Sequence, residues 1–197
     1  VSGILLFLWQ EKYLPFHYEY IEQFRLFHYS ADYFIEHCSY PSGIIEYLGS
    51  FLIQFFNQPH VGAGIVTFLL LSVGIGIQQI FKRIASHVDM PLAYLLPTLF
   101  LLFAGMDINY HLEGTLAFAL SVWFLNIQVS FVRPVHRMIS GVLLSWALYY
   151  LAGPAFALFA LCSVIYEWHK RELSMLYSAL LLPIAVLPAC YAYFIQH

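Results

Sequence analysis

The positions of the basic residues constrain the fold of this chain more than any other feature. Six of its eight Lys and Arg residues fall in three short clusters, Lys82-Arg83, Arg133-Arg137 and Lys170-Arg171. Between the clusters lie apolar stretches long enough to cross a bilayer. Eight of the eleven acidic residues fall in the segments that must then lie on the opposite side. This alternation predicts a polytopic membrane protein with one defined orientation.

The composition supports the same class of protein. Hydrophobic residues make up 61% of the chain and charged residues only 10%, whereas a soluble domain carries about 25% charged residues. Lipid can solvate so much apolar surface, but water cannot. The net charge of −3 provides no basic surface for nucleic acid. We therefore expect the lipid bilayer as a partner and no nucleic acid.

The apolar stretches define the expected spans. The run 1–9 covers only ~13 Å at helical rise, so it is interpreted as the outer end of a truncated first span. Six further stretches lie at about 61–81, 91–106, 114–132, 138–151, 155–168 and 174–195. The fold class expected is all-α, a polytopic transmembrane helical bundle of about seven spans. We expect residues 1–197 to form a single transmembrane domain, with six spans in 61–195, and to be a fragment of a longer chain.

The positive-inside rule sets the orientation of the chain. With the basic clusters in the cytoplasm, the segment 10–60, the loop 105–113 and the C-terminus lie on the outer side. The segment 10–60 then holds two amphipathic helices at the outer interface. One covers Tyr18–His37 and the other Gly43–Asn57, with Pro41-Ser42-Gly43 between them. A span at 43–57 is excluded, because it would move Lys82-Arg83 to the outside.

The first candidate cluster for chemistry lies on the helix expected at 18–37. Glu19 and Glu22 share a helical face, and Arg25 continues that face. The cluster is either a solvated stripe with one local ion pair, or it places a carboxylate that deprotonates an acceptor or holds a metal at the membrane surface. His28, Asp32 and Glu36 follow at four-residue spacing. No Cys or His cluster completes a ligand set there, so we assign no metal site.

The second candidate cluster is the short loop GMDINYHLEG at 105–114. Its polar residues are Asp107, Asn109, His111 and Glu113. Either these side chains satisfy the backbone of a turn, or two acids from separate elements converge at an outer cleft. On the cytoplasmic side, Glu167 is interpreted as an ordinary loop charge. Asn126 and Gln128 fall within a span, and a cavity lined by both would favour a transporter.

The order of these features resembles the N-terminal region of the GT-C class of integral-membrane glycosyltransferases. An acidic outer helix reads YEYIEQFRLFHYSADYF, a Pro-containing turn and an amphipathic helix read YPSGIIEYLGSFLIQFFNQP, and a span then opens with VGAGIV. The resemblance covers roughly residues 1–115. Asp107-Ile108-Asn109 stands where the class often has Asp-x-Asp, and the turn has one Pro rather than two.

The resemblance implies an inverting transfer from a polyprenyl-phosphate sugar at the outer face. Glu22 would activate the acceptor hydroxyl, and Asp107 would aid a metal or the acceptor. We assign substrate binding to Glu19, Arg25, His111 and Glu113, and leave a divalent cation open.

The whole chain also resembles a bacterial family of multi-pass inner-membrane proteins, which implies a place in the inner membrane but no function. The two alternatives to the enzyme are a non-catalytic membrane subunit, which binds partners or lipid through its aromatic outer helices, and a transporter.

Overall fold

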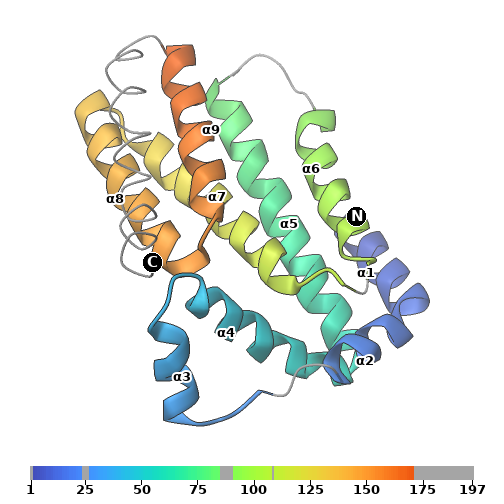
Figure 1. The fold of residues 1–197 in the computed structure, drawn as a ribbon. Coiled ribbons are helices and arrows are strands. Elements are labelled where there is room, and N and C mark those ends of the chain that lie inside the picture. The colour runs from blue at the N-terminus through green and yellow to red at the C-terminus, as the bar shows by residue number, and fades with distance from the viewer. Residues whose placement is uncertain (1, 24–26, 85–90, 108, 171–197) are drawn as a thin grey trace.

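The computed structural model describes residues 2–23, 27–84, 91–107 and 109–170. Every regular element in these ranges is helical, which confirms the all-α class. Five longer helices form a bundle, namely α5 (Pro59–Ile84), α6 (Pro91–Ala104), α7 (Leu112–Ser130), α8 (Pro134–Ala152) and α9 (Ala155–Lys170). They run alternately in opposite directions, so their connections fall at two opposite ends of the bundle (Figure 1).

Shorter helices gather at one of these ends (Figure 1). They are α1 (Ser2–Tyr13), α2 (Pro15–Gln23), α3 (Ala31–Cys38), α4 (Gly43–Ile53) and the 3₁₀ helix η1 (Gln54–Asn57). We call this end, which also contains residues 105–111 and the turn at Gly153, the acidic end. The opposite end carries Lys82, Arg83, Arg133, Arg137 and Lys170, and we call it the basic end.

Proline sets where several helices begin. Pro15, Pro59, Pro91 and Pro134 are the first residues of α2, α5, α6 and α8. At this position the missing N–H of proline costs nothing, because the first N–H groups of a helix have no partner inside it. The fixed φ of proline also suits a helix start.

The centre of the bundle is apolar. α7 packs against α5 on one side and against α8 and α9 on the other. Leu70 and Val73 of α5, Leu148 of α8 and Phe159 of α9 are fully buried in one continuous core. A second apolar cluster lies at the acidic end, where Tyr18 and Phe56 meet edge to face at 5.1 Å between ring centroids.

The expectation of seven spans is not met by these helices. Among the described residues, only α5 and α7 are long and apolar enough to cross a membrane. α6 and α9, with 14 and 16 residues, reach roughly 21 and 24 Å, short of the ~30 Å of a hydrocarbon core. α8 has 19 residues, but its serines, tyrosines, His136 and Arg137 lower its hydropathy. The seventh stretch, 174–195, lies outside the described residues.

The single helix predicted at Tyr18–His37 is also wrong. α2 ends at Gln23, and α3 begins only at Ala31. The Ser30 hydroxyl accepts a hydrogen bond from the Tyr33 backbone N–H at 3.2 Å, which caps α3 and starts a new helix there. The helix predicted at Gly43–Asn57 is present, as α4 followed by the single 3₁₀ turn η1.

Candidate functional site at the acidic end

Segments that are distant in sequence meet at the acidic end through specific hydrogen bonds. The His17 imidazole of α2 bonds the Gly105 carbonyl at 2.9 Å, which joins α2 to the loop 105–111. The Ser42 N–H, before α4, donates to the Tyr150 carbonyl of α8 at 3.0 Å. The Tyr150 hydroxyl donates to the Cys38 carbonyl at the end of α3. The short helices at this end are therefore hydrogen-bonded to the connections of the bundle.

A carboxylate stabilises the contact that the N-terminus of α4 makes with this region. The Ser42 hydroxyl donates to Glu46 at 2.6 Å, and the Tyr40 hydroxyl donates to the same carboxylate at 3.0 Å. Partial burial, together with the nearby Glu46 carboxylate, raises the pKa of Tyr40 to about 12. The phenol is therefore a hydrogen-bond donor throughout the physiological pH range.

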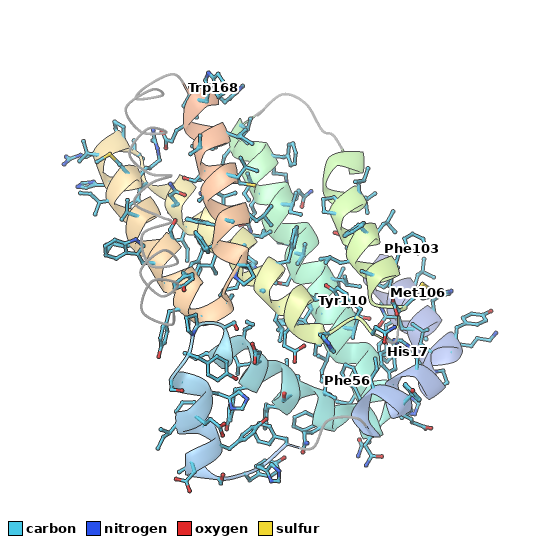
Figure 2. The ribbon with its side chains drawn as sticks, viewed as in Figure 1. His17, Phe56, Phe103, Met106, Tyr110 and Trp168 are labelled. Carbon is cyan, nitrogen blue, oxygen red and sulfur yellow. The ribbon has the colours of Figure 1, made fainter. Side chains whose placement is uncertain are left out.

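A small cavity lies beneath the loop 105–111. Its volume is about 40 Å³, enough for one or a few water molecules. Gln10, His17, Tyr18, Tyr110 and Thr115 supply its polar lining, and the rest of the wall is apolar. Figure 2 shows His17, Tyr110 and Phe56 close together at this end of the bundle.

Gln10 forms the polar floor of this cavity. Its side chain is 0% exposed, and its Oε1 accepts a hydrogen bond from the Tyr18 hydroxyl at 2.9 Å. The Gln10 Nε2 has no hydrogen-bond partner among the described residues. A buried amide donor without a partner is costly, so the cavity offers a binding position for a water molecule or for a ligand oxygen.

Glu113 is buried, in contrast to the outer cleft in which the sequence could have placed it. It lies in the first turn of α7 and is 8% exposed. A Cβ added to Gly49 of α4 would lie 2.6 Å from the Glu113 Cγ and 2.8 Å from its Cδ. The missing side chain of Gly49 therefore makes the space that the Glu113 carboxyl group occupies. The Glu113 side chain therefore lies at the contact between α4 and α7.

Asp107 caps the turn that leads into α7. Its carboxylate accepts hydrogen bonds from the Asn109 backbone N–H at 2.9 Å and from the Asn109 amide at 3.2 Å. This Asx-type arrangement is the local structural role that the sequence left open for the loop. Asp107 and His111 are both exposed, and His111 is the residue immediately before α7. Both side chains are accessible from outside the molecule.

The remaining predicted site residues lie on or next to α2. Glu19 is exposed on this helix. The structure describes Glu22 only by its place on α2, and Arg25 lies outside the described residues. α2 is fastened to the loop of Asp107 through His17. The structure thus places α2 next to the loop that contains Asp107, whereas the Glu113 side chain is buried against α4.

The part of the chain that the structure describes shows no obvious metal-binding site. Within those residues, no group of three or more His, Cys, Asp or Glu side chains lies close enough to hold one ion. Asp32 and Glu36 are exposed on α3. His37 bonds the Tyr33 carbonyl of its own helix at 2.8 Å.

The sequence missed a buried ionic network at the basic end. Glu167 was interpreted as a loop charge, but it lies on α9 and is 1% exposed. Its carboxylate accepts hydrogen bonds from the Arg137 Nε at 2.7 Å and from the Arg137 Nη2 at 3.3 Å. The Gln128 amide donates to the Ser163 hydroxyl at 2.6 Å beside this pair. The sequence signal was present, since each of these polar residues interrupts the end of an apolar stretch.

Asn126 and Gln128 make contacts inside the bundle. The Asn126 amide donates to the Gly76 carbonyl of α5 at 2.8 Å. Gln128 donates to the Arg137 carbonyl at 3.3 Å, as well as to Ser163. Both amides therefore tie helices together, which gives no support to a transport path through these residues.

Comparison with known proteins assigns the chain to a family without assigning an activity. The model of DUF6057, a family of unknown function, matches residues 1–197, and the chain belongs to that family. No curated protein and no solved structure matches the chain.

Proposed function

We propose that this member of the DUF6057 family is a membrane-embedded module that handles a polyprenyl-phosphate-linked sugar at its acidic end, in the manner of a GT-C-like glycosyltransferase. The observation that carries the proposal is the hydrogen bond from His17 of α2 to the Gly105 carbonyl. It joins α2 to the loop 105–111 beside the cavity that Gln10 lines. This junction brings together the two elements that the resemblance assigns to the site, and it leaves Glu19, Asp107 and His111 exposed beside them.

The surface of the bundle supports a place in the membrane. Large apolar side chains point outward from each of the bundle helices, and water would disfavour such a surface. Examples are Phe68 of α5, Phe100 of α6, Leu143 of α8 and Leu161 of α9, with Phe100 at 71% exposure. α5 and α7 would cross the bilayer completely, with the shorter α6, α8 and α9 packed beside them.

The charges at the two ends support one orientation. The basic end would face the cytoplasm under the positive-inside rule, and the acidic end would face outward. In a bacterium this protein would lie in the inner membrane. Exposed aromatic side chains near both ends, such as Trp168 and Tyr29, suit the two headgroup layers.

Burial changes the role proposed for one site residue. Because Glu113 is packed against Gly49, we assign it to the support of α4 rather than to substrate. Glu22 remains the proposed base, and Glu19, Arg25 and His111 remain proposed substrate contacts. Asp107 would act by shaping the loop, and His17 joins the set as the side chain that fixes this loop to α2.

The proposal is tested by lipid binding to the full-length protein. Native mass spectrometry would compare retention of a polyprenyl-phosphate sugar by the wild type with retention by a Glu22→Gln, Arg25→Ala, His111→Ala triple variant. The matched control is Asp32→Asn, an exposed acid on α3. We expect roughly tenfold weaker retention in the triple variant, as for the loss of about 1.4 kcal/mol, and no change in the control. Equal retention by all three proteins would refute a site at the acidic end.

The aromatic surface of α3 favours a second candidate, a non-catalytic subunit. No described residue of α3 is buried, and Phe34 and Ile35 are exposed. A partner protein could cover this face. Co-purification of a single partner that is lost on Phe34→Ser, with unchanged lipid retention, would favour this candidate over the enzyme.

A further inference from the structure

An apolar groove lies on the opposite half of the molecule from the candidate site. Its volume is about 390 Å³, within the size range of ligand pockets. α5, α7 and α9 form its walls, and Pro97 of α6 closes one side. The lining residues of α5 lie in its last turns, from Ile77 to Ile84, and those of α9 run from Leu158, in its first turn, to His169 at the basic end.

The inside of the groove suits a hydrocarbon chain. Leucine, isoleucine, valine and phenylalanine make up most of the wall. The Ser121 hydroxyl, which also lines it, already donates within the bundle, to the Ala117 carbonyl at 2.9 Å and the Ala155 carbonyl at 3.3 Å. Apart from Ser121 and Cys162, the described wall is polar only at Tyr166 and His169, towards the basic end.

Basic residues directly follow the groove lining at the basic end. Lys82 and Arg83 follow Phe81 at the end of α5, and Lys170 follows His169 at the end of α9. All of these basic side chains are exposed. Among the described residues of this end, the acid Glu167 is buried against Arg137 and offsets none of the exposed charges.

We propose that this groove binds one anionic phospholipid, with an acyl chain along α5, α7 and α9 and the phosphate at Lys82 and Lys170. Basic pockets between helices on the cytoplasmic side are a recurring site for such headgroups. Lys82 and Lys170 each directly follow a lining residue, Phe81 and His169, so one amphiphile would contact both the apolar wall and these bases. The lipid site is separate from the proposed sugar site, because the groove and the cavity lined by Gln10 share no lining residue.

Cys162 provides a direct probe, because its thiol lines the groove. In full-length protein with every other cysteine replaced by serine, the rate of maleimide labelling at Cys162 would be measured after delipidation. Phosphatidylglycerol or phosphatidylcholine would then be added in mixed micelles. We expect phosphatidylglycerol to slow labelling more than phosphatidylcholine does. Lys82→Ala and Lys170→Ala would each weaken this protection by about fivefold.

Three further variants separate the groove from general membrane effects. Cys162→Trp fills the groove and should abolish retention of phosphatidylglycerol in native mass spectra, whereas Leu161→Trp changes the neighbouring, outward-facing residue and should retain it. Lys12→Ala removes an exposed base at the acidic end and should have no effect. These variants leave Glu22, Arg25 and His111 unchanged, so the outcome is independent of the sugar site.

Other occupants would give different results. Protection of Cys162 that persists after complete delipidation would indicate that another segment of the chain fills the groove. Protection that rises with protein concentration would indicate a second copy. Either result, or equal protection by the two phospholipids, would overturn the proposal.

Discussion

Glu113 shows how one missing side chain decides where an acid can lie. The carboxyl group occupies space that any Cβ at position 49 would take, and the acid is buried as a result. From the sequence, Glu113 was grouped with Asp107 and His111, because all three follow one another within a short loop. Which of them faces solvent depends on α4, and the contact between positions 49 and 113 is not visible in local spacing.

The first prediction concerns this contact. Gly49→Ala should destabilise the protein by about 1–3 kcal/mol, because the new methyl group would overlap the Glu113 side chain. Gly64→Ala on α5 is the matched control, since its Cβ would meet only the Phe7 ring, at 3.9 Å. Thermal unfolding in detergent measures both. A loss of stability in the control as large as that in Gly49→Ala would contradict the account of Glu113.

The Arg137–Glu167 pair is the other residue-scale feature that local pattern concealed. Each residue lies next to an apolar stretch, where a loop charge and a buried charge look alike in sequence. The structure distinguishes them, because the Arg137 guanidinium also donates to the carbonyls of Phe131 and Val132. It thereby closes the connection between α7 and α8.

The second prediction is that Glu167→Gln destabilises the protein strongly. Removing one partner of a buried ion pair leaves the other charge uncompensated, at a cost of about 3–5 kcal/mol. Arg133→Gln, at an exposed position near Arg137, should cost far less. Midpoints of thermal unfolding would be compared at one detergent concentration. Similar midpoints for the two variants would show that the pair contributes nothing specific.

At the scale of elements, the acidic end is built by aromatic contacts. The Phe27 ring packs edge to face against Tyr29, Tyr33, Tyr47 and Phe51, with centroids 4.9 to 5.5 Å apart. It thus joins the segment before α3 to α3 and α4. The amphipathic helix expected over Tyr18–His37 gave no sign of the break before Ala31, because helical periodicity does not reveal a serine cap.

The third prediction follows from this cluster. Phe27→Ala should release α3 from α4 while leaving the bundle folded, because the cluster is separate from the core around α7. Limited proteolysis should then cut near α3 several-fold faster, with little change in the unfolding midpoint. Ile35→Ala, at a position 62% exposed, is the control and should leave the cleavage rate unchanged. Unfolding of the whole bundle in Phe27→Ala would mean that α3 is part of the main core.

At the scale of the whole molecule, the order of the helices could be predicted and their packing could not. Apolar stretches bounded by proline and basic residues gave the positions of α5 to α9, because these signals are local. The grouping of α2, α4 and the loop 105–111 at one end followed from the alternation of charge. The groove between α5 and α9, the Gly49 contact and the fastening of Ser42 to Tyr150 depend on pairs of residues distant in sequence, which no local pattern encodes.

The number of membrane spans is the second property that the sequence did not predict. The hydropathy of the apolar stretches predicted seven spans, but among the described residues only two helices are long and apolar enough to cross a membrane. Short apolar helices are ambiguous, because packing against a longer neighbour and crossing a membrane select the same residues. The arrangement of the ends is therefore the most informative property to measure.

The fourth prediction tests the central claim, that the acidic and basic ends face opposite sides of a membrane. In the full-length protein lacking other cysteines, Asp32→Cys reports on the acidic end and Arg133→Cys on the basic end, since both positions are exposed. An impermeant maleimide would be added to intact spheroplasts and to inverted membrane vesicles. We expect position 32 to react only in spheroplasts and position 133 only in inverted vesicles. Reaction of both positions from the same side, or extraction of the protein by carbonate, would contradict a membrane-embedded bundle with its acidic end outward.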